Sequence, residues 1–246
     1  MGAFNLTEAI RCVKASQAVY PGGHPELLFP DNKIQAFGFD PCVGFAVELE
    51  DRTLVSYCGT DSLRDALADV DVFLISNKNY PGLVHKGFSD GLDAVWPQMI
   101  SLIRKDKPVQ TTGHSLGASH SQLGQTRLKN EGYILLDCYS FATPKTGNVD
   151  FKLSFASLGL TNYKVMREGD VIPLLPWLPK FRMSGISTYL DGYGKLNSNL
   201  DEFLDMLDVL YEIIKKQGVP SLFVPEFITK HSVDGYMGDL LSNQAG

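Results

Sequence analysis

Residues 109–119 constrain the fold of this chain most strongly, because they predict a strand, a tight turn and a helix in succession. Their sequence is VQTTGHSLGAS, in which Ser115 lies between Gly113 and Gly117. A G-x-S-x-G pattern can place its serine on a strained bend, provided that the residues two before and two after lack bulk. We therefore expect Ser115 at the end of a strand, where a helix begins.

The rest of the chain alternates strand-like and helix-like runs, which predicts an α/β architecture without a linker or repeat that would divide it. Residues 1–246 are accordingly expected to form a single domain. The strand-like runs outside the turn segment are 42–50, 53–60, 133–143 and 162–170. The helix-like runs are one that begins after Asn5, then 61–70, 86–105 with a kink at Pro97, 118–130 and 200–218. The apolar run 133–143 is typical of a strand that is covered on both faces of a parallel sheet.

Charge and hydropathy exclude several classes of protein. The formal net charge of −6 is spread along the chain, with no basic block, so nucleic-acid binding is not expected. No apolar run is long enough to cross a bilayer. The N-terminus does not read as a secretory signal, which predicts a cytoplasmic protein if that end is native and a secreted one if a leader has been removed.

The four cysteines show no metal-ligand spacing, so no metal site is expected. Buried thiols are the default expectation for cysteines of this kind. Cys42 and Cys58 flank an expected hairpin whose turn lies near Asp51. A disulfide between them is a second possibility for an exported protein.

A serine on such a bend can serve as a nucleophile if a base and an oxyanion site are close to it. The helix that follows directs its first amide groups and its positive dipole end at the serine. The backbone N–H of Leu116 is therefore a candidate oxyanion donor. Enzymes built on this turn place the serine first, then an acid, then a histidine along the chain.

His231 is the candidate base, because it alone among five histidines follows Ser115 with room for an acid between them. His120 would lie on the helix after Ser115 and point elsewhere, so a structural role is expected for it. The remaining histidines are His24, His85 and His114.

Asp170 is the favoured acid, since it ends a strand-like run and precedes the irregular VIPLLP segment. A carboxylate at the tip of a strand is well placed to orient an imidazole. Competing carboxylates in the same interval remain open, and Glu168 is close enough in sequence to require a control. The competitors are Asp150 and Asp191, whereas Asp137 sits inside an apolar run.

Several of these segments together resemble the class 3 (fungal-type) lipase family, over roughly residues 43–236. The matching segments, in order, are YCGTDSLRDALADV, VHKGFSDGL, TTGHSLGAS, FATPKTGNVDF, NYKVMREGDVIPLLP and HSVDGYM. The resemblance implies an α/β-hydrolase fold with a mostly parallel central sheet flanked by helices. It also implies Ser115, Asp170 and His231 as a catalytic triad, with Thr60 and Leu116 in the oxyanion hole.

The chain also departs from the family pattern. Cys58 stands where the family commonly has arginine, and the residues after GHSLG are polar, ASHSQ, where small apolar ones are usual. Residues 191–218 match nothing in the family and are interpreted as a helical insertion before the histidine. These differences concern the substrate range more than the reaction.

The expected activity is that of a serine hydrolase of carboxylic esters, most simply a lipase, that needs no cofactor. Residues 61–70 form a candidate lid whose apolar face carries Leu63, Leu67 and Val70, and Trp177 with Leu178 forms a candidate pocket or lipid-interface patch. The expected partner is a lipid or acyl-ester substrate, with transient contact to a lipid interface.

Other functions share the same residues. A catalytically silent hydrolase fold used for binding or signalling is the main alternative, and the presence of all three triad candidates speaks against it. Feruloyl esterase, phospholipase and acyltransferase activities fit the same triad. The sequence gives no oligomeric state.

Overall fold

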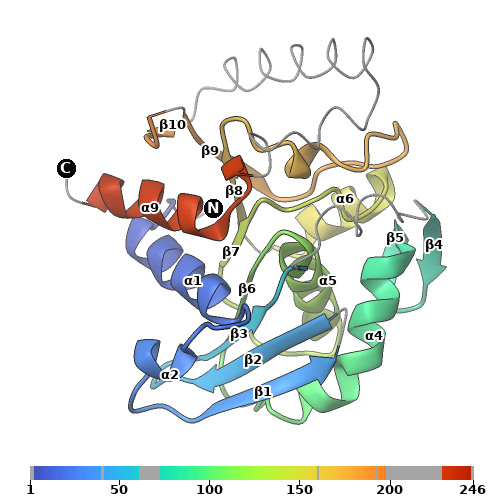
Figure 1. Ribbon diagram of the computed structural model, residues 1–246. Coiled ribbons are helices and arrows are strands. Elements are labelled where there is room, and N and C mark those ends of the chain that lie inside the picture. Colours follow the sequence, from blue (N-terminus) through green and yellow to red (C-terminus); the bar gives the residue numbers. More distant parts are fainter. Residues whose placement is uncertain are drawn as a thin grey trace.

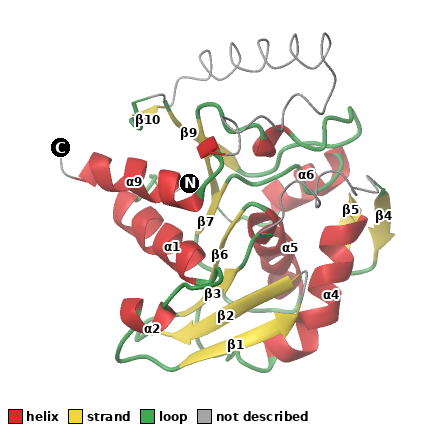
Figure 2. Cartoon of the chain, viewed as in Figure 1, coloured by secondary structure: helices red, strands yellow, loops and turns green. Residues whose placement is uncertain are grey.

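The computed structural model describes residues 3–39, 42–60, 73–159, 161–191, 193–197 and 229–244. Its main feature is an eight-stranded sheet in the order β1-β2-β3-β6-β7-β8-β9-β10, beside a separate hairpin of β4 and β5 (Figures 1 and 2). The strands are β1 (Ile34–Phe39), β2 (Cys42–Glu48), β3 (Thr53–Tyr57), β4 (Leu74–Asn77), β5 (Tyr80–His85), β6 (Val109–His114), β7 (Cys138–Phe141), β8 (Asn162–Arg167), β9 (Ile186–Leu190) and β10 (Leu196–Asn197). The helices are α1 (Leu6–Ala18), α2 (Pro25–Leu28), α4 (Lys86–Ile100), α5 (Leu116–Asn130), α6 (Val149–Ser157), the 3₁₀ turn η1 (Ile172–Leu174) and α9 (Val233–Gln244).

The centre of the large sheet is parallel. Strands β3, β6, β7, β8 and β9 run in the same direction, while β1 and β2 at one edge and β10 at the other are antiparallel to their neighbours. The predicted mostly parallel sheet flanked by helices is therefore confirmed. Because the central strands are parallel, their carboxyl ends meet at one edge of the sheet, where α/β proteins bind their ligands.

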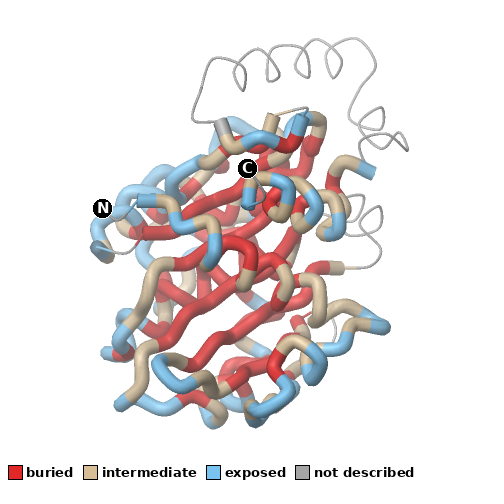
Figure 3. The backbone as a smooth tube through the Cα atoms, turned by 90° about the vertical axis from the view of Figure 1, so that its left-hand side faces the viewer, coloured by how far each residue is buried: buried red, intermediate tan, exposed pale blue. Residues whose placement is uncertain are grey.

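Helices cover both faces of the sheet, and each face has its own hydrophobic core. Helices α1 and α9 lie over one face, and α4, α5 and α6 lie over the other (Figure 1). Successive strand residues point to opposite faces, so Leu54 enters the core under α1 while Val55 enters the core under α4 and α5. Long buried runs pass through the middle of the molecule in Figure 3.

Two predicted elements are shorter than expected. The strand expected over 133–143 is β7, four residues long, because residues 134–136 form only an isolated bridge to Val109 at the start of β6 and Ile134 is exposed. The helix expected over 86–105 ends at Ile100. After Ile100, the amides of Leu102 and Ile103 each donate a hydrogen bond to the carbonyl oxygen three residues earlier. These 3₁₀-type bonds replace the α-helical pattern and end the helix. Pro97 lies inside α4, and its kink stays a prediction.

The predicted hairpin is present, and the cysteines are buried. Strands β2 and β3 form the expected antiparallel hairpin around Asp51. All four cysteines lie within the described residues, are buried and form no disulfide, which confirms the default prediction. Burial raises the pKa of the Cys42 thiol to about 12, so this thiol is kept protonated and unreactive.

Some predictions lie outside the described residues. These are the lid candidate 61–70, with Leu63, Leu67 and Val70, and residues 192 and 198–218 of the proposed insertion. Within the described part of the chain, no helix combines the length and the apolar character needed to span a bilayer.

The N-terminal helix begins as predicted, and its cap gives a test of the fold. The Asn5 side chain accepts a hydrogen bond of 3.1 Å from the Glu8 amide. We predict that Asn5→Ala lowers the free energy of unfolding by about 1 kcal/mol in urea titrations, because one helix amide loses its acceptor. Thr7→Ala, an exposed change in the same turn, should leave that free energy unchanged or slightly raised. Equal losses in both variants would contradict the capping role.

Candidate active site

Ser115 occupies a strained bend between β6 and α5. Its backbone angles are φ 59° and ψ −127°, a conformation that non-glycine residues rarely adopt. The Ser115 amide donates a hydrogen bond of 2.9 Å to the carbonyl oxygen of Phe141 at the end of β7. The bend is therefore held by the sheet itself, and its predicted strand-to-helix context is confirmed.

The two flanking glycines are required by close backbone contacts. A Cβ on Gly113 would lie 2.3 Å from the Gly117 carbonyl oxygen, and a Cβ on Gly117 would lie 2.2 Å from the Tyr57 carbonyl oxygen. Real Cβ atoms do not approach backbone oxygens that closely. The start of α5 therefore packs directly on the end of β3, which no residue larger than glycine would allow.

This packing brings the predicted oxyanion donors to the same edge of the sheet. Leu116 is the first residue of α5, so its amide has no acceptor within the helix and is available to an anion. Thr60 follows β3, and the neighbouring Gly59 is so close to His114 that a Cβ there would lie 2.8 Å from the His114 carbonyl oxygen. Both residues lie beside the bend, and their roles as donors stay a proposal.

Asp170 and His231 form a buried pair. Asp170 follows the end of β8 and is 1% exposed, while His231 shortly precedes α9 and is 6% exposed. The imidazole Nδ1 lies 2.9 Å from Oδ2 and 3.1 Å from Oδ1 of the carboxylate. A carboxylate accepts, so Nδ1–H donates, and Nε2 of the neutral ring carries the lone pair.

Two further donors hold the Asp170 carboxylate. The Tyr236 hydroxyl donates to Oδ2 over 2.7 Å, and the Ile172 amide donates to Oδ1 over 2.9 Å. Burial alone would raise the pKa of Asp170, but His231 and these hydrogen bonds outweigh it and hold that pKa below its ordinary value of 3.8. Asp170 is therefore an ionised carboxylate at neutral pH, able to orient the imidazole.

The free nitrogen of His231 lies in a buried setting beside the bend. Among the described residues, no group forms a hydrogen bond with Nε2 of His231. His114, which directly precedes Ser115, places its ring centroid 4.6 Å from that of His231. His114 Nε2 also lies 2.7 Å from the His231 carbonyl oxygen. These contacts bring the histidine segment against the residue next to Ser115.

The competing carboxylates lie in other settings. Asp150 is exposed in the first turn of α6, and Glu168 is exposed after β8. Asp191 accepts hydrogen bonds from amides of its own turn. Asp137 is half-buried just before β7. Asp170 alone binds His231 among the carboxylates that the structure describes, and it does so through both oxygens.

The histidines other than His231 also separate by environment. His24 is exposed and paired with Glu26. His120 is buried in α5 near Tyr57 and Phe88, and burial lowers its pKa to about 3. This placement agrees with the structural role expected for His120.

The polar run after the bend has a structural explanation. Ser119, Ser121 and Gln122 belong to α5, and all three are buried. Ser121 Oγ donates to Thr111 over 2.9 Å, and Gln122 Oε1 accepts from Thr146 over 2.8 Å. The helix therefore packs on the sheet partly through satisfied hydrogen bonds, where small apolar residues would pack without them.

Trp177 and Leu178 lie in the loop that follows η1. Leu178 is 40% exposed, and Trp177 is half-buried with the Lys145 ammonium 5.4 Å from a ring centroid. Their predicted role as a pocket or interface patch stays a proposal. Within the described residues, no cluster of His, Cys, Asp or Glu could hold a metal ion.

Sequence reasoning missed three residues of this site. Tyr236 and the Ile172 amide bind the candidate acid Asp170, and His114 contacts the candidate base His231. Tyr236 lies within the HSVDGYM segment, five residues after His231. A tyrosine at that spacing does not by itself predict a hydrogen bond to the carboxylate that binds the histidine. Its role depends on how α9 packs against β8, which only the fold reveals.

Removing the Tyr236 hydroxyl tests the buried carboxylate. A depressed pKa adds stability that is present above the unfolded value and is lost as the pH falls through the folded value. We predict that Tyr236→Phe lowers the free energy of unfolding by about 2 kcal/mol at pH 7, since a hydrogen bond to a charge is lost. This deficit should narrow as the pH falls below 3.8 and then through the lower pKa of folded Asp170, because the hydroxyl no longer binds a charge once the carboxyl is protonated.

Tyr139→Phe is the matched control for this change. Its hydroxyl accepts a hydrogen bond of 3.1 Å from the Asn5 amide, a neutral donor. The loss of stability should therefore not depend on pH between about 3 and 7, because no charged partner titrates there. A pH-independent loss in Tyr236→Phe as well, measured by urea titration, would show that the hydroxyl does not hold an ionised Asp170.

Gly117 gives a test of the bend. We predict that Gly117→Ala lowers the free energy of unfolding by about 2 kcal/mol or more, because its Cβ would meet the rigid Tyr57 carbonyl. At Gly238 in α9 a Cβ would meet no described atom within 4 Å, so Gly238→Ala should raise that free energy by about 1 kcal/mol. Equal effects of the two changes would contradict the close packing of α5 on β3.

The chain is similar in sequence and in fold to a family of known proteins. The family model described as Lipase (class 3) matches residues 54–180, slightly more than half of the chain. Lipase ZK262.3 of Caenorhabditis elegans is 25% identical over 197 residues, covering 70% of this chain and 56% of that protein. The lipase of Rhizomucor miehei is 29% identical over 138 residues, covering 52% and 38%.

A secreted mono- and diacylglycerol lipase A of Penicillium camembertii is 27% identical over 136 residues, covering 51% of this chain and 43% of that protein. The chain thus spans about half the length, or less, of these curated relatives. Among solved structures, a triacylglyceride lipase of Rhizomucor miehei superposes with a TM-score of 0.68 at 20% identity, covering 77% of this chain and 82% of the other.

A lipase of Rhizopus microsporus var. chinensis superposes with a TM-score of 0.65 at 22% identity, covering 77% and 76%. At this identity the structural likeness concerns the fold, which is that of the α/β-hydrolases. Sheet order, serine bend and family match agree, and the chain belongs to the class 3 lipase family.

Proposed function

We propose that this protein hydrolyses carboxylic esters, with Ser115 as nucleophile, His231 as base and Asp170 as the acid that orients the base. The observation that carries this proposal is the buried Asp170–His231 pair, which leaves Nε2 as an acceptor beside the serine bend. A serine hydroxyl becomes a competent nucleophile only when such a base removes its proton.

Each step then follows from the chemistry of these groups. His231 Nε2 takes the Ser115 proton as Oγ attacks the ester carbonyl, and the Asp170 carboxylate stabilises the resulting imidazolium. The amides of Leu116 and Thr60 hold the oxyanion, aided by the positive end of α5. The imidazolium returns its proton to the leaving alcohol, and a water activated in the same way releases the acyl group.

The proposed substrates are acylglycerols or other acyl esters. Two observations support this class: the names of the fungal relatives, and the apolar run after Asp170 that ends in the part-exposed Trp177 and Leu178. A lid formed by residues 61–70 would cover the site in water and turn its apolar face to lipid. Feruloyl, phospholipid and acyl-transfer substrates use the same triad, and a panel of esters graded by chain length and head group separates them.

Ser115→Ala tests the proposed reaction. We predict that it abolishes turnover of p-nitrophenyl butyrate and labelling by a fluorophosphonate probe, because both require the hydroxyl. Ser157→Ala, an exposed change at the end of α6, should leave both unchanged. Failure of the wild-type protein to hydrolyse any ester or to accept the probe would favour the silent binding fold instead.

A further inference from the structure

The end of helix α1 and the turn after it reach the segment that carries His231 in two ways, directly and through His114. Gln17 Nε2 donates a hydrogen bond of 2.6 Å to Asp234 Oδ1 in the first turn of α9. The Tyr20 hydroxyl lies 2.7 Å from Nδ1 of His114. His114 in turn reaches the His231 carbonyl oxygen through its other nitrogen, over 2.7 Å. A chain of hydrogen bonds thus runs from the N-terminal region to the backbone of the candidate base.

The direction of these hydrogen bonds follows from the acceptor at one end. A carbonyl oxygen can only accept, so His114 Nε2 carries the proton and donates it to His231. His114 is 3% exposed, and burial together with the neighbouring His231 lowers its pKa to about 3, so the ring is neutral. Its Nδ1 is therefore an acceptor, and the Tyr20 hydroxyl must be the donor.

We propose that Tyr20 and His114 are positioning residues, which fix the backbone of His231 so that its imidazole faces the Ser115 hydroxyl. The proposal rests on the function proposed above. Tyr20 selects the tautomer of His114, and that tautomer is the one able to bind the His231 carbonyl. In the other tautomer, the lone pair of Nε2 would face the carbonyl oxygen and repel it.

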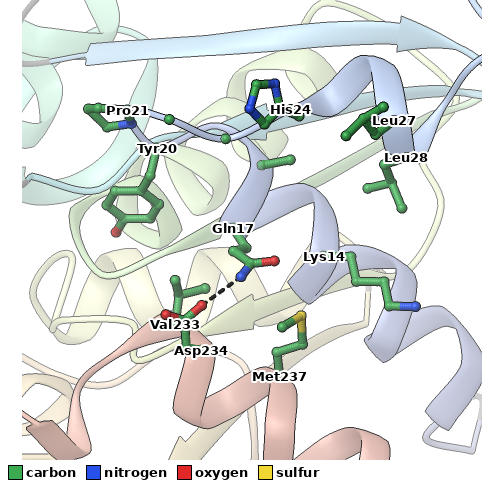
Figure 4. A pocket seen from close by; sticks show the side chains of 13 residues that line it. Lys14, Gln17, Tyr20, Pro21, His24, Leu27, Leu28, Val233, Asp234 and Met237 are labelled. Atoms are coloured by element: carbon green, nitrogen blue, oxygen red, sulfur yellow. Dashed lines mark hydrogen bonds between the residues drawn. The ribbon is translucent and has the colours of Figure 1, made fainter.

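The packing around Tyr20 explains why hydrogen bonds are needed here. A pocket of about 670 Å³ lies between the end of α1, the loop after it and the start of α9 (Figure 4). Tyr20, Val233 and Asp234 all line it. One side of the histidine segment therefore borders open space, although Val233 also packs against the core under α1 and α9. A small displacement of a catalytic group lowers the rate of reaction strongly. Hydrogen bonds that hold His231 in place should therefore increase the rate.

The Tyr20 side chain is also tied to the proposed oxyanion segment. A Cβ on Gly59 would lie 2.1 Å from the Tyr20 hydroxyl oxygen, so that hydroxyl sits directly against the backbone before Thr60. The Tyr20 hydroxyl thus lies next to the segment that carries Thr60, and it also binds His114, which binds the backbone of His231. Tyr20 is in place to set the relative position of these two parts.

The test uses three variants of the full chain. His114→Leu removes the donor to His231, whereas His114→Gln keeps a donor at a similar reach. Tyr20→Phe removes only the hydroxyl. We expect His114→Leu and Tyr20→Phe to lower kcat for p-nitrophenyl butyrate about tenfold or more with KM unchanged, and His114→Gln to retain kcat within about threefold. Tyr139→Phe, which removes a hydroxyl away from the site, should leave kcat unchanged.

A second readout does not depend on activity. Long-range ¹H–¹⁵N spectra of histidine-labelled protein report the tautomer of each ring. The Nε2–H form of His114 is expected in the wild type, with a mixture of tautomers in Tyr20→Phe. Equal kcat losses in His114→Leu and His114→Gln, or an unchanged tautomer together with an unchanged kcat in Tyr20→Phe, would overturn the proposal.

The spectra also separate this proposal from the proposed function. If Tyr20→Phe shows the predicted change of tautomer but the wild-type protein hydrolyses no ester, the hydrogen-bond chain stands and the esterase assignment fails. If Ser115→Ala abolishes turnover while Tyr20→Phe changes neither the tautomer nor kcat, the esterase assignment stands and the positioning role fails.

Discussion

The close packing of α5 on the end of β3 is the contact on which the rest of the site depends. It requires glycine at 113 and 117, and it forces Ser115 into a positive-φ conformation that the surrounding sheet must hold. Strain of this kind costs on the order of 1–3 kcal/mol and persists only where neighbouring structure over-determines it. The hydrogen bond from the Ser115 amide to β7 and the parallel pairing of β6 with β3 supply that constraint. The bend thereby presents the serine and the first amides of α5 at the same edge.

Burying the charge of Asp170 also costs free energy, and several hydrogen-bond donors around the carboxylate offset this cost. The Ile172 amide lies two residues after Asp170, while His231 and Tyr236 come from one distant segment, and each gives a hydrogen bond. A buried carboxylate without such partners would take up a proton and lose its ability to orient an imidazole. Because α9 carries Tyr236 and closely follows His231, docking this helix on the sheet delivers both groups at once. The ion pair of Arg167 with Asp239, at 2.5 Å, holds the same helix at the end of β8.

The glycine spacing is a local signal, and it predicts the bend at Ser115 because it sets the backbone conformation there. The order of residues favours His231 as the base and the end of a strand-like run favours Asp170 as the acid, but the sequence alone leaves other carboxylates open. Contacts between distant segments carried no such signal. Tyr20 and Tyr236 are ordinary aromatic residues in the sequence, and their hydroxyls acquire partners only when α1 and α9 pack on the same face. The expected strand over 133–143 is longer than β7 for a related reason: an apolar run does not show which of its residues pair with the neighbouring strand.

The family match covers only part of the candidate site. Residues 54–180 contain Ser115 and Asp170, the proposed nucleophile and acid, whereas His231, Tyr236 and Tyr20 all lie outside that range. The matched region alone therefore holds a strained serine and a carboxylate without the histidine that binds it. Helices α1 and α9, which pack against each other over the second core, complete the site from the two ends of the chain. The two helices reach His231 indirectly. Tyr236 of α9 binds the carboxylate of Asp170, and Tyr20, just after α1, binds His114, whose other nitrogen lies against the His231 carbonyl. Changes at the α1–α9 contact should therefore shift His231 without altering any residue of the proposed triad.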